Sequence, residues 1–204
     1  MIAIIDYGMG NLRSLENALE RLGAQYCVTS DPLAIQQASR VILPGVGNAA
    51  QAMENLRAGG LVPVIKDLRR PVLGICVGMQ VMCRDSEETL SVEGGRTALT
   101  PCMGIFDSHV RRFVPSADAK VPHMGWNSLG NVSGKLMKGI SSGECVYFVH
   151  SFAPALCQDT VATCIHGRCM FSAALRYENF YGTQFHPEKS GEAGERILAN
   201  FLAL

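Results

Sequence analysis

A cysteine between two glycines is the first place in this sequence where residue types and spacing suggest chemistry. Cys76 lies at the centre of the run G-I-C-V-G at 74–78, after the apolar run 71–73 and before residues 79–82, which have the composition of an opening helix. A nucleophile with glycines at minus two and plus two, between strand and helix, follows the pattern of the nucleophile elbow with Cys in place of Ser. The turn strains the central residue, and larger side chains two positions away would clash with neighbouring backbone.

A helix that begins at this turn would activate the cysteine. Its unpaired N–H groups point at the Cys76 side chain, and its dipole favours thiolate over thiol. The Val77 N–H is then placed to receive an oxyanion. The same pattern also fits a turn of small residues around a buried, inert cysteine, and G-x-C-x-G alone does not decide between the two.

A candidate base lies near the other end of the chain, in the run Q-F-H-P-E at 184–188. Residues 181–185 have the pattern of a strand that would deliver His186 and Glu188. In an extended segment a spacing of two keeps both side chains on one face, so Glu188 could orient His186 toward Cys76. This is the Cys–His–acid logic of an activated nucleophile. Elbow and H-P-E together are far more specific than either part.

The elements that must position these residues alternate between strand and helix in the first half of the chain. We predict strands at 2–6, 25–28, 40–43 and 71–73, and helices at 12–22, after 47 through about 57, and from 79. Such alternation indicates a parallel, doubly wound sheet, which binds ligands at the carboxyl ends of its strands. The run P-G-V-G at 44–47 falls at that edge. A dinucleotide site at Gly8-Met9-Gly10 is disfavoured, because Arg13 stands where the third glycine should be.

The second half changes character. Strand-like runs at 104–113, 144–149, 161–165, 171–177 and 180–185 have short connections, which predicts antiparallel additions to the sheet, and a last helix covers 190 to about 201. No linker or repeat divides the chain. We therefore expect an α/β fold in one domain, residues 1–204, with a mostly parallel sheet.

Composition excludes several classes of function. The formal net charge of the 204 residues is zero, which does not favour nucleic acid or an anionic membrane as a partner. No apolar run approaches the ~20 residues of a membrane span, and the start of the chain lacks a signal peptide's basic region. The eight cysteines form no C-x-x-C pair and no zinc spacing, so we expect no metal, reduced thiols and a cytoplasmic location.

Several motifs together resemble a known family. G-I-C-V-G-M-Q and Y-G-T-Q-F-H-P-E look like the class I (triad) glutamine amidotransferases. The runs D-Y-G-M-G-N, L-P-G-V-G, P-H-M-G-W-N, Y-F-V-H-S and H-P-E-K-S resemble in particular the glutaminase subunits of imidazole glycerol phosphate synthases. The matching segments extend from residue 6 to residue 190, essentially the whole chain.

The resemblance implies that glutamine is hydrolysed to glutamate and ammonia without a cofactor. Cys76 would attack the side-chain carboxamide, and His186, oriented by Glu188, would move the protons. The family's oxyanion strand corresponds to 44–47, so the Val46 N–H would join that of Val77. The chain has no Walker loop and no Lys/Arg nest for a phosphorylated acceptor. In the family the ammonia passes through an internal channel to a (β/α)₈ cyclase subunit, which makes imidazole glycerol phosphate and AICAR.

The resemblance also implies a set of substrate-binding residues: Gly47, Gln80, Glu88, His150 and Ser151. Gln80 lies one helical turn after the nucleophile and on its side. Gln80 could instead be a polar group on a helix surface, and Glu88 part of a charged loop pair with Glu87. Two features depart from the family pattern: the segment 93–102, and Phe152, where the family commonly has Tyr.

For the partner interface the resemblance implies Asn11, Trp126 and Lys189. Trp126, the single tryptophan, lies in P-H-M-G-W-N at 122–127, which we predict to be a loop because it is bounded by Pro and contains Gly. A tryptophan on such a loop either folds back over the core or projects as an interface anchor. The resemblance favours the anchor.

Three rival functions stay open at this point. The first is a glutaminase subunit of another synthase, such as that of anthranilate or aminodeoxychorismate. The second is a γ-glutamyl peptidase that acts without a partner. The third is a non-catalytic regulatory or scaffolding subunit, which would have no use for an intact Cys76, His186 and Glu188.

Overall fold

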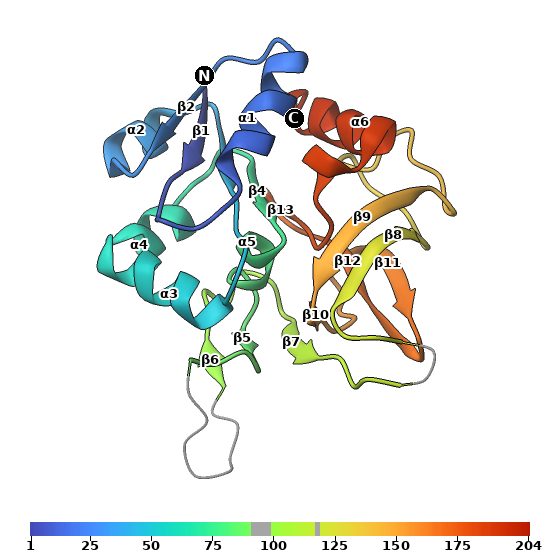
Figure 1. The fold of residues 1–204 in the computed structure, drawn as a ribbon. Helices are drawn as coiled ribbons and strands as arrows, with labels where there is room; N and C mark the ends of the chain where they lie inside the picture. The colour runs from blue at the N-terminus through green and yellow to red at the C-terminus, as the bar shows by residue number, and fades with distance from the viewer. Residues whose placement is uncertain (91–98, 117–118) are drawn as a thin grey trace.

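The structure, a computed structural model, describes residues 1–90, 99–116 and 119–204 (Figure 1). Its main sheet has seven strands in the order β11-β12-β13-β4-β3-β1-β2. Strands β2, β1, β3, β4 and β13 are parallel, whereas β11 and β12 extend the sheet in antiparallel fashion. The strands are β1 (Ile2–Ile5), β2 (Tyr26–Thr29), β3 (Arg40–Leu43), β4 (Val72–Ile75), β11 (Thr160–His166), β12 (Cys169–Tyr177) and β13 (Phe180–Thr183). The predicted α/β class with antiparallel additions is confirmed.

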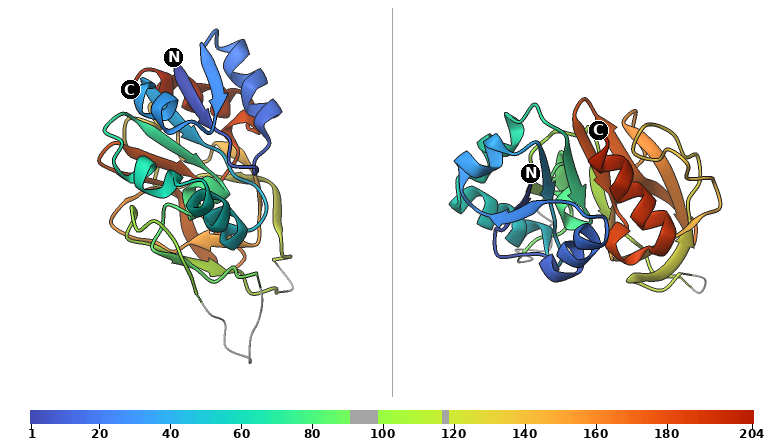
Figure 2. Two further views of the ribbon diagram at one scale, coloured as in Figure 1. Left: turned by 90° about the vertical axis from the view of Figure 1, so that its left-hand side faces the viewer. Right: turned by 90° about the horizontal axis from the view of Figure 1, so that it is seen from above.

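Helices cover both faces of this sheet. Helices α1 and α6 lie on one side, and α2, α3 and α4 lie on the other (Figures 1 and 2). Their bounds are α1 (Leu12–Arg21), α2 (Pro32–Gln37), α3 (Ala49–Ala58), α4 (Leu61–Lys66) and α6 (Gly191–Leu202). Helices α1, α3 and α6 were predicted from the sequence, whereas the two six-residue helices α2 and α4 were not. Short helices leave a weak periodic signal because they span fewer than two turns.

Local sequence explains where the main elements begin and how they pack. Strands β1, β4 and β13 are buried along their whole length, as a parallel sheet covered on both faces requires. Helix α1 starts at Asn11, whose side chain accepts a hydrogen bond from the Ser14 N–H, and α3 starts at Asn48 in the same way. Because β1, β3, β4 and β13 run parallel, their carboxyl ends meet at one edge of the sheet.

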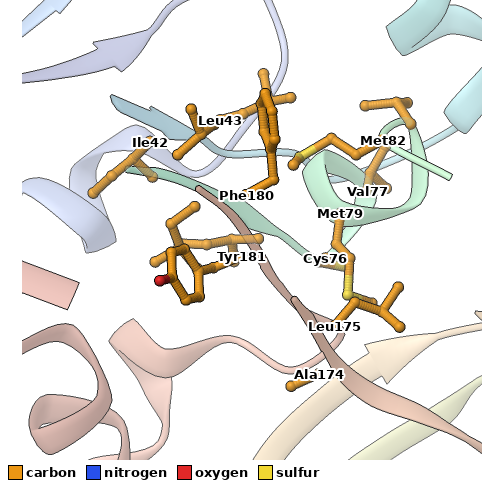
Figure 3. Close-up of a cluster of buried hydrophobic side chains, with 14 of the residues drawn as sticks. Ile42, Leu43, Cys76, Val77, Met79, Met82, Ala174, Leu175, Phe180 and Tyr181 are labelled. Atoms are coloured by element: carbon orange, nitrogen blue, oxygen red, sulfur yellow. The ribbon is translucent and has the colours of Figure 1, made fainter. Parts of the chain in front are cut away.

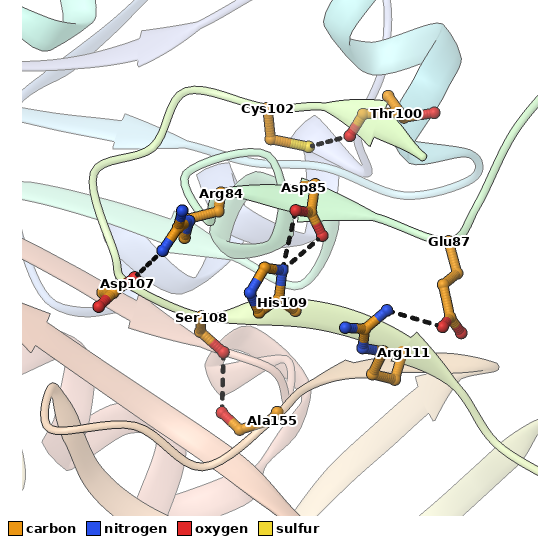
Figure 4. Close-up of polar contacts among 10 residues, drawn as sticks. All are labelled: Arg84, Asp85, Glu87, Thr100, Cys102, Asp107, Ser108, His109, Arg111 and Ala155. Carbon is orange, nitrogen blue, oxygen red and sulfur yellow. Dashed lines mark hydrogen bonds and ion pairs between the residues drawn. The ribbon is translucent and has the colours of Figure 1, made fainter. Parts of the chain in front are cut away.

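The other strands of the second half form two further sheets. Strands β10 (Phe152–Pro154), β7 (His109–Arg112), β5 (Asp85–Ser86) and β6 (Thr100–Pro101) make one of them. Polar contacts join its strands: His109 Nδ1 lies 2.8 Å from the Asp85 carboxylate, and Arg111 pairs with Glu87 at 2.9 Å (Figure 4). The predicted strand 104–113 is half wrong, because the strand begins only at His109 and residues 104–108 are irregular.

Strands β8 (His123–Ser128) and β9 (Cys145–His150) form the remaining two-stranded sheet. The predicted loop at 122–127 is therefore wrong. The backbone pairs in continuous register with β9, and Gly125 takes a φ of +121°, which suits glycine. Exposure alternates along β8, so His123 is buried while Met124 and Trp126 point outward. A Pro before the segment and a Gly within it were poor indicators of a loop.

Close packing at the end of β4 forces the chain into a sharp turn. A Cβ on Gly78 would lie far inside contact distance of the Leu43 carbonyl oxygen, and one on Gly74 would lie 2.8 Å from the Gly78 backbone. Helix α5 (Val77–Gln80) consequently sits directly against the ends of β3 and β4, with Cys76 among apolar side chains of the core (Figure 3). The glycines at minus two and plus two are needed for this approach, as predicted.

We predict that Gly78→Ala destabilises the protein strongly, because the atom its methyl group meets is backbone and cannot move aside. The free energy of unfolding should fall by about 3 kcal/mol or more, which lowers the melting temperature by roughly 6–12 °C in a chain of this size. Gly59→Ala is the control: its φ is −77° and its Cβ would meet Asn55 O at 3.4 Å, an ordinary contact. Equal melting temperatures of the two variants would contradict this account.

Candidate active site

The parallel sheet brings the two halves of the predicted triad to the same edge. Strands β4 and β13 are neighbours, with Ile75 opposite Thr183. Cys76 directly follows β4, and His186 lies three residues beyond the end of β13. The Cys76 N–H donates to the Thr183 carbonyl at 2.7 Å, which ties the turn to the strand that leads to His186.

Cys76 holds a strained backbone conformation. Its φ is +53° and its ψ −110°, a combination that non-glycine residues rarely adopt. Its side chain is 3% exposed, and the short helix α5 begins at the next residue. Strand, turn and helix therefore follow in the order predicted for an elbow. Strain of this kind is typical of functional sites, where surrounding packing maintains it.

His186 and Glu188 form a close pair, although not in the way we expected. His186 Nδ1 lies 2.7 Å from Glu188 Oε1, and the two side chains are 2% and 3% exposed. The segment is not extended, because Pro187–Lys189 forms a 3-10 turn that folds Glu188 back under the imidazole. Ser190 Oγ donates to the His186 carbonyl and accepts from the Tyr147 N–H, so this turn is anchored to β9.

The electrostatics of His186 favour its protonated form. Burial alone would lower the pKa of His186, but the Cys76 sulfur and the Glu188 carboxylate outweigh it and raise the pKa to about 10. Within the described residues, His186 Nε2 has no hydrogen-bond partner. The ring is thus held at Nδ1 and free at Nε2, which suits an acid–base group that exchanges a proton with a neighbouring thiol or substrate.

A cavity of about 140 Å³ opens on Cys76 and His186, a volume that suits a molecule of amino-acid size. Segments from the parallel sheet edge form one wall and the end of β9 forms the other. The predicted residues Val46, Gly47, Val77, Gln80, Glu88, His150 and Ser151 all line it, together with Val149 and Phe152. The structure therefore brings together every substrate and oxyanion residue expected from the sequence.

The expected oxyanion donors are not both free. The Val77 N–H donates to the Gly45 carbonyl at 3.3 Å, so this carbonyl occupies the place where we expected a substrate oxygen. The segment 44–47 is held by Tyr7, whose hydroxyl donates to the Pro44 carbonyl at 2.8 Å. Burial and the nearby Cys76 sulfur raise the pKa of Tyr7, which keeps the hydroxyl a donor. Our sequence analysis did not single out Tyr7.

Two of the substrate residues also have local partners. Glu88 Oε2 accepts from the Ala49 N–H at 2.7 Å, so Glu88 joins the cavity wall to the first turn of α3. Burial raises the pKa of Glu88, and the Ala49 N–H partly offsets that rise. The Gln80 amide donates to the Phe152 carbonyl at 2.9 Å and to Gln184 Oε1 at 3.0 Å, which leaves its oxygen for the cavity.

The residues expected at a partner interface lie outside the cavity. Trp126 is 58% exposed and packs edge-on against Tyr147, with ring centroids 6.2 Å apart. It does not fold back over the core, and its edge approaches Gly191 at the start of α6. Lys189 is exposed on the 3-10 turn beside the triad, whereas Asn11 is half-buried and caps α1. The segment 93–102 that departs from the family pattern lies largely outside the described residues.

The structure indicates two further properties of the described residues. None of their helices is long and apolar enough to cross a membrane. No group of three or more His, Cys, Asp or Glu side chains among them is arranged to hold a metal ion. The Cys–His–Glu arrangement has the chemistry of nucleophilic attack on an acyl carbon, with proton transfer through an imidazole.

Comparison with known proteins identifies the class to which this fold and site belong. The family model described as glutamine amidotransferase class-I matches residues 3–204, so the chain belongs to the class-I glutamine amidotransferase family. Two solved structures titled as glutamine amidotransferases share the fold. One has a TM-score of 0.70 at 18% identity and covers 100% of this chain and 98% of its own. The other, from Thermotoga maritima, has 0.61 at 17% identity, covering 99% and 82%.

Sequence relatives narrow the class to one kind of subunit. A Bacteroides thetaiotaomicron protein named imidazole glycerol phosphate synthase subunit HisH is 50% identical, covering 100% of this chain and 99% of its own length. The Colwellia psychrerythraea protein of the same name is 44% identical, covering 98% of this chain and 92% of its own length. The similarity thus extends over nearly the full length of both relatives.

We predict that a glutamine-like electrophile labels Cys76 alone. Burial raises the pKa of Cys102 and Cys164 to about 12 and that of Cys83 well above its usual value, so these thiols stay protonated. Cys145 is exposed, but it does not line the cavity of amino-acid size that Cys76 and His186 share. Peptide mapping after labelling measures the outcome. A small general reagent such as iodoacetamide should reach Cys145 too, and serves as the control; labelling of Cys83 by the glutamine analogue would contradict the special role of Cys76.

We predict that Glu188→Gln lowers the pKa of His186, because the variant loses the carboxylate that stabilises the imidazolium. NMR titration of the ¹⁵N-labelled imidazoles measures this, with the surface variant Glu195→Gln as control. The wild-type pair stabilises the fold most below the unfolded-state pKa of about 6.5, and this contribution declines as pH rises through about 10. In Glu188→Gln the decline should be smaller and begin at lower pH, because only the Cys76 sulfur still raises the pKa of His186. An unchanged His186 titration in Glu188→Gln would disprove the pairing.

Proposed function

We propose that this protein is the glutaminase subunit of an imidazole glycerol phosphate synthase in histidine biosynthesis. One observation carries the proposal: the strained Cys76 and the Glu188-bound His186 face one cavity of amino-acid size. Membership of the class-I glutamine amidotransferase family supports glutamine as the substrate. The HisH relatives, 50% and 44% identical over nearly their full length, support this synthase over one making anthranilate or aminodeoxychorismate.

The reaction begins with a proton on His186 and a thiolate at Cys76. The raised pKa of His186 supports this distribution of charge at neutral pH. Sulfur attacks the side-chain carboxamide carbon, the C=O becomes an oxyanion, and His186 Nε2 gives its proton to the departing nitrogen. Ammonia leaves and a γ-glutamyl thioester remains on Cys76. His186 then takes a proton from water, hydroxide attacks the thioester, and glutamate and the thiolate are released.

The oxyanion requires the segment 44–47 to rearrange. In this structure the Gly45 carbonyl would face the developing negative charge, since it accepts from the Val77 N–H. Rotation of the peptide between Gly45 and Val46 removes that oxygen and turns the Val46 N–H toward the cavity. Val46 and Val77 would then supply the two donors of an oxyanion hole. The Gly47 φ of +94° and the absence of side chains at 45 and 47 favour such a rotation.

The ammonia acceptor belongs, in this proposal, to a second chain. The active-site cavity is too small for a nucleotide, and the relatives are named as subunits of a synthase. We propose a (β/α)₈ cyclase as the partner and an internal channel for ammonia. The outward face of β8 and β9 carries Met124, Trp126, Tyr147 and Val149, and Val149 also lines the cavity. A partner on this face would therefore lie next to the site of ammonia release and close to Lys189, which follows the triad in the 3-10 turn packed against β9. Asn11, at the start of α1, stays part of the proposed interface.

Residues 1–204 would act as a single glutaminase domain, which the family match over 3–204 supports. We further propose a cytoplasmic location. The eight cysteines are all free, as a reducing compartment requires.

We predict that Cys76→Ala abolishes glutamine-dependent synthesis by the complex but leaves synthesis from added ammonia within about twofold of wild type. The variant removes the nucleophile without touching the acceptor site on the partner. Product formation by the reconstituted synthase, measured with each nitrogen source, separates the two half-reactions. Loss of the ammonia-dependent activity as well would mean that Cys76 has a structural role, and the proposal would fail.

We predict that Trp126→Ala weakens partner binding by about 2 kcal/mol, as truncation of an interface hot spot does. The isolated subunit should lose no more than about 1 kcal/mol, the value of one exposed edge-on aromatic pair. Titration calorimetry with the cyclase and thermal melting measure the two effects. Leu33→Ala on α2 is the matched control, since Leu33 is 64% exposed and lies on a different part of the surface. A large drop in melting temperature with normal binding would place the interface elsewhere.

A further inference from the structure

Gln184 lies against the proposed nucleophile but outside the cavity. Its side chain is completely buried, and its Nε2 lies 3.6 Å from Cys76 Sγ, a hydrogen-bonding distance for sulfur. It does not line the cavity that holds the substrate in our proposal. A buried amide costs free energy unless its donors and acceptor are paired, so its contacts show what holds it there.

The orientation of this amide is determined by a chain of obligatory donors and acceptors. The Phe152 carbonyl can only accept, so the Gln80 group 2.9 Å away must be its NH₂. The second hydrogen of that NH₂ points at Gln184, 3.0 Å away, so Gln184 must present its oxygen. The remaining end of the Gln184 amide, which faces Cys76, is therefore NH₂. The sulfur receives a hydrogen bond, and the geometry allows no exchange of N and O.

A second series of hydrogen bonds, made by two histidines, leads to the same Phe152 carbonyl. His150 Nδ1 lies 2.8 Å from the Phe152 oxygen, so it carries the hydrogen, and His150 Nε2 accepts from His123 Nδ1 at 2.9 Å. Asn127 then donates to His123 Nε2 at 3.1 Å. Burial lowers the pKa of His150 to about 3 and that of His123 to about 4, so both rings are neutral, as this pattern requires. The Phe152 carbonyl thus has both lone pairs occupied and cannot turn away from Gln80.

We propose that Gln184 is a catalytic residue that donates a hydrogen bond to the Cys76 thiolate, and that Gln80, through the Phe152 carbonyl, is the positioning residue that keeps its NH₂ on the sulfur. Hydrogen bonds to a charged acceptor are roughly twice as strong as neutral ones. Gln184 therefore stabilises the nucleophile before attack, while His186 Nε2 stays free to move protons. The inference rests on the proposed function for its effect on rate, but the contact itself does not depend on the reaction.

The experiment measures thiolate formation at Cys76 directly. The rate of iodoacetamide addition to Cys76, followed by peptide mapping against pH, gives the midpoint of ionisation in the full-length protein. Gln184→Met has a similar volume and no donor, and we expect its midpoint to rise by about one pH unit, with an order of tenfold slower alkylation at neutral pH. In the synthase complex kcat should fall by a similar factor while KM for glutamine changes less than twofold, because Gln184 does not contact the substrate.

Thr183→Val is the matched control, since Thr183 directly precedes Gln184 at the end of β13 and is equally buried, and its backbone carbonyl, which the variant keeps, is what contacts Cys76. A second measurement covers the case in which Gln184→Met unfolds. In the wild type, the side-chain amide resonances of Gln184 should shift with the same pH midpoint as Cys76 alkylation, and should not titrate there in Cys76→Ala. An unchanged midpoint in a folded Gln184→Met, or amide resonances insensitive to Cys76, would overturn the proposal. A synthase without glutaminase activity would instead overturn the proposed function and leave these two measurements intact.

Discussion

The contact between Gly78 and the Leu43 carbonyl is the constraint on which the site depends. It seats the start of α5 directly on the ends of β3 and β4, and no side chain larger than hydrogen fits there. The chain can reach this position only if Cys76 takes a positive φ, which turns its sulfur out of the sheet and toward His186. The same contact places the segment 44–47 over Val77. Cys76 and the segment 44–47 are therefore positioned by one packing requirement of the backbone.

The site is nevertheless built from three separate sheets. The parallel sheet supplies Cys76, His186 and the segment 44–47, whereas the end of β9 and Phe152 at the start of β10 supply the opposite wall. Hydrogen bonds join these parts: the His186 N–H donates to the Tyr147 carbonyl at 3.0 Å, and Gln80 reaches the Phe152 carbonyl. The β8–β9 ribbon thus holds His186 in place through the Tyr147 carbonyl, while its outward face carries Trp126 and Val149. Val149 also lines the cavity, so a partner bound to that ribbon would lie next to it.

Much of this arrangement could be predicted from the sequence, because it follows from strong local signals. Glycines around Cys76, H-P-E after a strand, and alternating strands and helices each have a short-range physical cause. The rest could not be predicted. Strand β8 pairs with a segment some twenty residues away, so its exposure pattern depends on a partner that Gly125 and Pro122 obscure. The 3-10 turn at Glu188 and the role of Gln184 depend on contacts across the sheet, and a buried glutamine just after a strand has no distinct local pattern.

The pairing of Val77 with Gly45 follows from the same physical logic. An N–H left without a partner in a closed pocket costs about 1–3 kcal/mol. The Gly45 carbonyl satisfies the Val77 N–H while no substrate oxygen is present. Opening the oxyanion hole must therefore be offset by something that the isolated subunit lacks, either the developing charge on the substrate or contacts made by a partner. Tyr7 holds the neighbouring Pro44 carbonyl, so the rearrangement is confined to the peptides that follow it. In the proposed mechanism, a resting state of this kind would keep glutamine hydrolysis slow until the substrate or a partner supplies that free energy.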